Sequence, residues 1–205
     1  KLGSLLIQKN KFLEAITPLK YALTLNPKHL EIHTLLSIAY QNTGDFEKAE
    51  NHSLHAIDLD PKISNNHYLL ATSLLRQDKT EEAEQALRKS IEIKPDFFRG
   101  NLNLGVLLQQ IGKSEEAQIY LEKALKIEPQ NANANYSLGS NLSDLRRFDE
   151  AYILTKKAIK LDPNFFEAHL NLGVIYLKKK NLTEAENSTR KAIDINSSSH
   201  NAYCN

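Results

Sequence analysis

The chain has 205 residues, of which 41% are hydrophobic and 25% are charged, a composition typical of a globular protein and not of a disordered one. Its formal net charge of +1 argues against nucleic acid as a partner. No apolar run approaches the roughly 18 residues that a membrane-spanning helix needs, so we expect no membrane association.

The two ends of the sequence carry few signals. The first residues, "KLGSLLIQKN", lack the layout of a signal peptide, and we expect a cytoplasmic location. Cys204 is the only cysteine, which excludes an intramolecular disulfide. The chain contains no methionine, so we interpret the sequence as a piece of a longer chain.

The sequence repeats itself with a period of 34 residues. The string "NLGV" at 103–106 returns at 171–174, and "SLGS" at 137–140 lies midway between them. Five of the six prolines share this spacing: Pro27, Pro61, Pro95, Pro129 and Pro163. In chain order, the register predicts a single array with a partial repeat over 1–29, complete repeats over 30–63, 64–97, 98–131, 132–165 and 166–199, and the start of a further repeat over 200–205.

Each complete repeat is predicted to contain two helices. In the interval 98–131, apolar residues recur at helical spacing in two segments that are separated by "IGKSEEA". There Gly112 is expected to end the first helix and Ser114 to cap the second. Gly44 and Asp45 are expected to make the same break in "TGDFEKA". Proline then separates one pair from the next, because it cannot continue a helix.

Two positions of the repeat hold only small residues, alanine in one ladder and glycine, serine or alanine in the other. They are Ala15, Ala49, Ala83, Ala117, Ala151 and Ala185, and Gly3, Ser37, Ala71, Gly105, Gly139 and Gly173. We expect helices to approach closely at these positions. Because one pair cannot bury its own apolar face, stability should come from the stacking of neighbouring pairs.

These features resemble the tetratricopeptide repeat (TPR), a 34-residue helix-turn-helix unit with a Leu-Gly pair, a later aromatic, two alanines and a proline. The best match is "HLNLGVIY" at 169–176, followed by Ala185 and Ala192. The first large aromatic of the family motif is replaced here by His33, His67, Asn101, Asn135 and His169. The resemblance implies an all-α fold, a right-handed α-solenoid of antiparallel helical pairs whose first helices line a concave groove.

Helix geometry selects the side chains that face this groove, since residues three or four apart share a face and the ladders occupy the opposite one. The selected residues are mostly uncharged. They are Thr34, Ile38, Asn65, Tyr68, Thr72, Arg99, Leu102, Asn103, Val106, Asn133, Tyr136, Ser137, Ser140, Glu167, Leu170, Asn171 and Val174. Amides beside apolar and tyrosine side chains suit an extended peptide. The sequence therefore predicts a protein–protein interaction scaffold that binds a peptide or a partner's helix in its groove.

The resemblance also separates two kinds of partner. The lysine, asparagine and arginine clamp with which chaperone-tail-binding members of the family hold a C-terminal carboxylate is missing here. Asn103 and Asn171 are similar to the groove asparagines in the repeat arrays of protein-modifying glycosyltransferases. An alternative function is therefore the substrate-recruiting arm of a larger enzyme, such as a glycosyltransferase or a sulfotransferase.

We expect this segment to have no catalytic activity and no cofactor. It contains neither a Gly-rich phosphate loop after a strand nor a recognisable Ser-His-Asp set. His52 and His55 lie three residues apart on a second helix, but no third ligand is evident, so we interpret them as an exposed pair and expect no metal site. Apolar surface at the two ends predicts end-to-end self-association near Leu2, Leu5, Leu6 or Tyr203.

Overall fold

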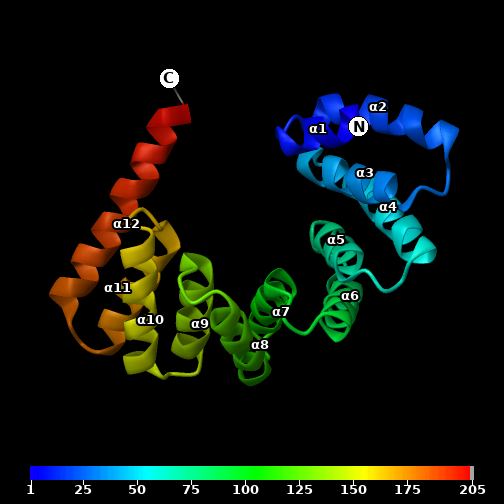
Figure 1. Cartoon of the computed structure of the whole chain (residues 1–205). Helices are drawn as coiled ribbons and strands as arrows, with labels where there is room; N and C mark the ends of the chain where they lie inside the picture. Colours follow the sequence, from blue (N-terminus) through cyan, green and yellow to red (C-terminus); the bar gives the residue numbers. More distant parts are fainter. Residues whose placement is uncertain (204–205) are drawn as a thin grey trace. The chain divides into compact units, whose positions relative to one another are not determined.

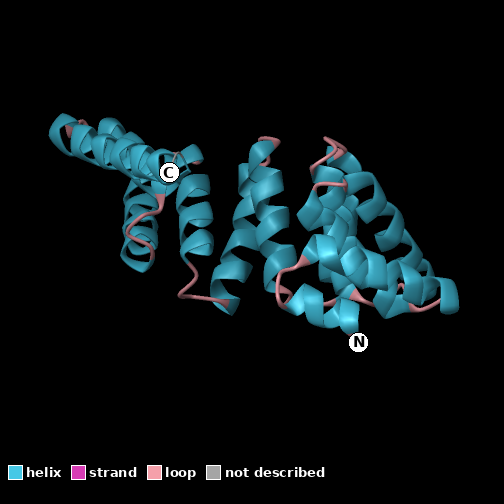
Figure 2. Cartoon of the chain, turned by 90° about the horizontal axis from the view of Figure 1, so that it is seen from above, coloured by secondary structure: helices cyan, strands magenta, loops and turns pink. Residues whose placement is uncertain are grey.

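The structure, a computed structural model, describes residues 1–203. Twelve helices follow one another over this range, and it contains no strand (Figures 1 and 2). The structure divides into two compact units, residues 1–100 and the residues from 101 onward. The boundary falls within α7 (Phe98–Gln110).

The first unit is a stack of helical pairs. Its helices are α1 (Leu2–Gln8), α2 (Phe12–Leu25), α3 (Leu30–Thr43), α4 (Phe46–Leu59), α5 (Ser64–Leu75) and α6 (Thr80–Ile93). Each helix contacts the next one along the chain, and the first helices α1, α3 and α5 of successive pairs also contact one another.

The second unit is built in the same way. After α7 its helices are α8 (Ser114–Ile127), α9 (Ala132–Asp144), α10 (Phe148–Leu161), α11 (Phe166–Lys178) and α12 (Leu182–Tyr203). From α8 onward each helix contacts the next, and α9 also contacts α11. The predicted fold class, an all-α stack of repeated helical pairs, is confirmed.

The turns within the pairs share one backbone conformation. Gly44 and Gly112 have φ of +84° and +79°, as their place at the end of a helix predicts. The equivalent residues of the other repeats also have positive φ although none is glycine: Asn10, Asp78, Arg146 and Lys180, at 57° to 61°. The left-handed turn is thus a property of the repeat, and glycine marks it only twice.

The caps of the second helices follow the sequence less closely. The Asp45 carboxylate accepts a hydrogen bond of 3.2 Å from the backbone N–H of Lys48, so Asp45 caps α4 as predicted. The prediction that Ser114 caps α8 is wrong. Lys113 is the residue before the helix and Ser114 is already inside it.

The small-residue ladders lie where helices touch. All six alanines of the first ladder are buried. A Cβ atom added to Gly105 would lie 2.6 Å from Leu121 Cγ, and one added to Gly139 would lie 2.8 Å from Thr155 Oγ1. Neither contact leaves room for a larger side chain, which agrees with the predicted close approach.

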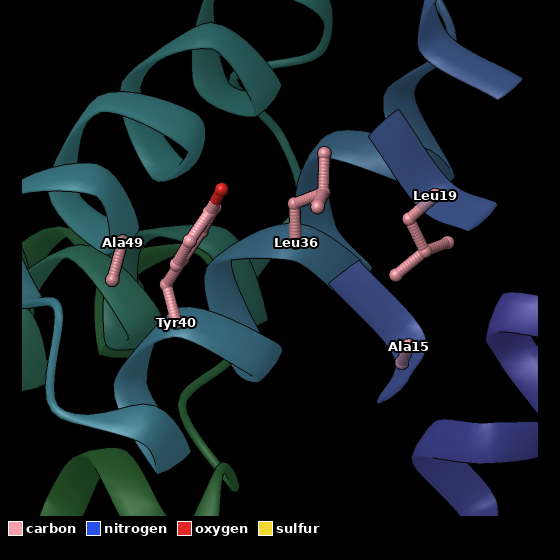
Figure 3. Close-up of a cluster of buried hydrophobic side chains, with 5 residues drawn as sticks. All are labelled: Ala15, Leu19, Leu36, Tyr40 and Ala49. Atoms are coloured by element: carbon pink, nitrogen blue, oxygen red, sulfur yellow. The ribbon is translucent and has the colours of Figure 1, made fainter. Parts of the chain in front are cut away.

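In the first unit, the core crosses from one pair to the next. A cluster of buried side chains joins Ala15 and Leu19 of α2, Leu36 and Tyr40 of α3, and Ala49 of α4 (Figure 3). It includes the alanine ladder of two successive repeats, as expected if stacking supplies the stability.

A polar side chain secures the linker before each pair in four repeats. His33 Nε2 donates to the carbonyl of Pro27 over 3.0 Å, and His67 Nε2 to that of Pro61 over 2.9 Å. Asn135 Nδ2 and His169 Nε2 make the equivalent bonds to Pro129 and Pro163, at 3.1 and 3.0 Å. In these four repeats the residue that replaces the family's aromatic therefore holds the proline linker on its own first helix.

The last helix differs from the other second helices. α12 has 22 residues, whereas each of the other second helices has 14. The register places Ser197 where other repeats have proline, so nothing there ends the helix. Residues 200–203, predicted to begin a further repeat, continue α12 and form no separate helix.

Candidate functional site

On α5 of the first unit, the predicted groove residues are partly exposed and already have partners. The Tyr68 ring meets Phe97 edge-on, with centroids 5.5 Å apart. Thr72 Oγ1 accepts a hydrogen bond of 2.7 Å from Gln41 Nε2 and donates one of 3.0 Å to the carbonyl of Leu69. Asn65 is partly exposed on the same helix.

The predicted residues of α3 and α7 fall on both sides of the unit boundary. In the first unit, Thr34 Oγ1 donates to Asn66 Oδ1 over 2.9 Å, Ile38 is half-buried, and Arg99 is exposed. In the second unit, Leu102, Asn103 and Val106 are half-buried, which is typical of side chains on the rim of a packed face.

On α9, the predicted residues separate into exposed, half-buried and buried side chains. Asn133 is exposed, whereas Ser137 is only 7% exposed and lies in the helix packing, so it contributes little open surface. The Tyr136 ring lies against Phe165 with centroids 4.9 Å apart. Burial raises the pKa of the Tyr136 phenol, and the charge of Glu167 raises it further.

Among the predicted groove residues, those on α11, the first helix of the last pair, present the most exposed apolar surface. Glu167 is exposed, Leu170 is half-buried, and Val174 is 47% exposed. Asn171 is half-buried and oriented, because its Nδ2 donates a hydrogen bond of 3.0 Å to Thr155 Oγ1 of α10. Its carbonyl oxygen has no hydrogen bond among the described residues, so it is free to accept one from a ligand.

Two glutamines were missed by the sequence analysis. Gln41 Nε2 bridges α3 to α5 through Thr72 and Ser73, and Gln109 Nε2 bridges α7 to α9 through Ser140 and Asp144 at 3.0 and 2.6 Å. They lie 68 residues apart, at the same position of the repeat. The recurrence of glutamine at this position was the sequence signal by which the two residues could have been found.

Three histidines gather in the first unit. The rings of His33 and His55 are stacked with centroids 5.1 Å apart, and His33 Nδ1 lies 3.0 Å from His52 Nδ1. His52 also stacks on Tyr40 and is half-buried, so the prediction that His52 and His55 form an exposed pair is wrong for His52. In the described part of the chain, no group of three or more His, Cys, Asp or Glu side chains is arranged to hold a metal ion.

The pKa of His52 is lowered from an ordinary value of 6.5 to about 4, mainly by burial and in smaller part by the charges of His33, His55 and Lys20. When His33 and His52 are both neutral, their hydrogen-bond partners determine which nitrogen donates. The carbonyl of Pro27 can only accept, so His33 Nε2 donates and His33 Nδ1 must accept from His52 Nδ1.

Of the helices in the described residues, none combines the length and the apolar character needed to cross a membrane. The repeated pairs, the linker bonds and the shared turn define the chain as an all-helical repeat protein. Models of the tetratricopeptide repeat match residues 6–71, residues 64–97, 98–131 and 132–165, and residues 154–187. The chain belongs to the tetratricopeptide-repeat family.

Solved structures of the same fold have low sequence identity. MamA 41-end from Desulfovibrio magneticus RS-1 is 20% identical, with a TM-score of 0.74, over 82% of this chain and 96% of that one. YrrB, described as a TPR protein with an unusual peptide-binding site, is 22% identical, with a TM-score of 0.72, over 86% and 91%. PilF from Pseudomonas aeruginosa is 21% identical, with a TM-score of 0.80, over 91% and 85%. No curated protein matches the sequence significantly.

Proposed function

We propose that the chain is a protein-interaction module whose second unit binds an extended peptide along the first helices α7, α9 and α11. The observation that carries the proposal is on α11, where the free carbonyl of the oriented Asn171 lies on the same helix as the exposed apolar side chain of Val174. An amide that accepts from a peptide N–H, beside a surface for an apolar side chain, is the combination that extended peptides require.

The spacing of the asparagines supports a ligand that spans two repeats. Asn103 and Asn171 occupy equivalent positions 68 residues apart. Helices pack about 8–10 Å apart, so two repeats separate these amides by roughly 16–20 Å. An extended peptide at about 3.3 Å per residue covers that distance in about five or six residues. The known peptide binding of YrrB, a structure with the same fold, is consistent with this use of the repeats.

The experiment is a peptide-array screen followed by titration of the best binder against the parent, Asn103→Ala, Asn171→Ala and the double variant. Each single substitution should cost about 0.5–1.5 kcal/mol, and the double about their sum, since the two sites do not touch. Affinity should then fall roughly ten- to a hundredfold in the double variant.

The matched control is Asn187→Ala, which removes an exposed asparagine from the second helix α12 and should leave affinity unchanged. A binder whose affinity is the same for the parent and a folded double variant would show that recognition does not use these amides. A selected ligand that is an amphipathic helix would replace the extended peptide as the occupant.

A further inference from the structure

The outer face of the last helical pair is unusually apolar. Leu182 and Ile193 of α12 are 70% and 59% exposed, and with Leu177 of α11 they line a hollow of about 490 Å³. An apolar face of this kind marks a contact surface.

The repeat register identifies what covers this face elsewhere in the second unit. Thr155 lies one period before Thr189, is fully buried, and accepts the hydrogen bond of Asn171 from the following first helix, whereas Thr189 is exposed. Ile159, one period before Ile193, is half-buried, whereas Ile193 is exposed. The shape that fits the hollow is therefore the first helix of a following pair.

The chain carries such a helix with an open face at its other end. Leu5 of α1 is 47% exposed, although the equivalent Ala39 and Ile175 are fully buried. Leu2 is 61% exposed, although the equivalent Leu36 is fully buried. These two leucines are the side chains that a first helix uses against its neighbours in the interior of each unit.

Charge complementarity points to the same pairing. In each unit a basic residue at the turn of one pair reaches the second helix of the preceding pair: Lys79 Nζ lies 2.8 Å from Glu50 Oε2, and Arg147 Nη1 donates to Gln118 Oε1 over 2.9 Å. Lys11 occupies the position of Lys79 and Arg147 in the register.

The acidic partner of this contact is present on α12. Glu186 occupies the position of Glu50 and Gln118 in the register. In the single chain, Lys11 and Glu186 make only local surface pairs, with Glu14 and Arg190, and such pairs are readily exchanged. A second copy placed one period beyond α12 would bring its Lys11 to Glu186.

We propose that copies of this chain stack head to tail, with α1 and α2 of one copy on the outer face of α11 and α12 of another. Leu2 and Leu5 then fill the hollow between Leu182 and Ile193, and Lys11 pairs with Glu186 of the neighbouring copy. The contact is heterologous, so it leaves one open face of each kind and extends to chains of copies. It does not involve the groove and stands independently of the function proposed above.

The test is sedimentation velocity of the whole chain over a range of concentrations, with each end blocked in turn. Leu5→Asp blocks the face of α1, and Ile193→Asp blocks the face of α12. Each variant alone should associate at least about tenfold more weakly than the parent, because association would bury an unpaired carboxylate. A mixture of the two should form a one-to-one dimer and nothing larger, since each supplies the open face that the other lacks.

The control is Ile153→Asp, which places the same charge on an exposed isoleucine of α10 outside both faces and should associate like the parent. Circular dichroism verifies that each variant is folded. The charge contact is tested separately: Lys11→Glu and Glu186→Lys should each weaken association, and a mixture of the two should restore it.

A parent that stays monomeric at the highest concentration overturns the proposal. So does association that Leu5→Asp leaves intact but Ile193→Asp abolishes, which would indicate two α12 faces in a symmetric dimer. A mixture of the two blocked variants that stays monomeric also overturns it.

Discussion

His33 Nδ1 and His52 Nδ1 lie 3.0 Å apart, within hydrogen-bond distance, so one of these two nitrogens donates to the other. His33 Nε2 donates to the Pro27 carbonyl, so in the neutral pair His33 Nδ1 accepts the hydrogen bond from His52 Nδ1. Protonating His52 places a charge in a half-buried site beside His33, His55 and Lys20. The site between α3 and α4 therefore favours the neutral form of His52.

The first prediction is that acid destabilises the first unit through His52. Its pKa is about 4 in the folded chain and 6.5 when unperturbed, so on acidification the unfolded chain binds the proton first. The stabilising effect of the neutral form is complete above about pH 7.5 and is lost progressively between 6.5 and about 4. Discounted for partial exposure, the free energy of unfolding should fall by about 1 kcal/mol between pH 7.5 and pH 5.5.

Urea denaturation of the parent and of His52→Gln at these two pH values measures the effect. His52→Gln should lose this part of the pH dependence, because the amide can still donate to His33 and does not titrate. His55→Gln should reduce the dependence only in part, since burial is the main cause of the low pKa. Equal pH dependence in the parent and His52→Gln would contradict the assignment.

The second prediction concerns the linker bond of His67 to Pro61. His67→Leu replaces the imidazole with an apolar side chain and leaves the carbonyl of Pro61 without its donor. The loss should cost about 1–3 kcal/mol of stability. His67→Asn should cost less, because Asn135 makes the same bond to Pro129 in another repeat. Chemical denaturation of the parent, His67→Leu and His67→Asn measures these changes in stability. If the leucine variant is the more stable of the two, the bond contributes little and the position is dominated by apolar packing.

The third prediction concerns the left-handed turns. Arg146 has φ of +60°, a conformation that costs an L-residue about 1 kcal/mol or more and glycine almost nothing. Arg146→Gly should therefore raise the free energy of unfolding by up to about 1 kcal/mol, despite the greater freedom of glycine in the unfolded chain. Gly112→Arg, the reverse change at the equivalent turn, should lower it. If denaturation experiments show that Arg146→Gly lowers the free energy of unfolding and Gly112→Arg raises it, the turn conformation is not strained.

The helical pairs, their linkers and their close contacts could be predicted from the sequence because they depend on local chemistry repeated every 34 residues. The turn at Arg146 could not, because no glycine marks it. The burial of individual side chains could not be predicted either. Ser137 lies on the predicted face of α9 yet is buried, because periodicity gives the direction of a side chain and not its distance from the neighbouring helix. His52 was placed at the surface because its partner His33 lies 19 residues away, on another helix.

The same limit applied to the groove asparagines. The sequence placed Asn171 on the groove face but could not show that Thr155 holds it, since that contact forms between two repeats. This hydrogen bond decides which of the amide's atoms remain available to a ligand.

The last prediction is that Thr155 orients Asn171 and that the bond is measurable without any ligand. Thr155→Val keeps the shape of a fully buried side chain but removes the hydroxyl that accepts from Asn171 Nδ2. We expect each of Thr155→Val and Asn171→Ala to lower the free energy of unfolding. The double variant should lose less than the sum, with a coupling of about 0.5–1.5 kcal/mol, because the two residues share one bond. Thr155→Ser, which loses the methyl group but retains the hydroxyl, should retain the coupling, because the hydroxyl is the group that accepts from Asn171. Additive losses in the cycle, measured by urea denaturation, would mean that Asn171 is not held by Thr155 in solution, and its amide would then meet a ligand without a preset orientation.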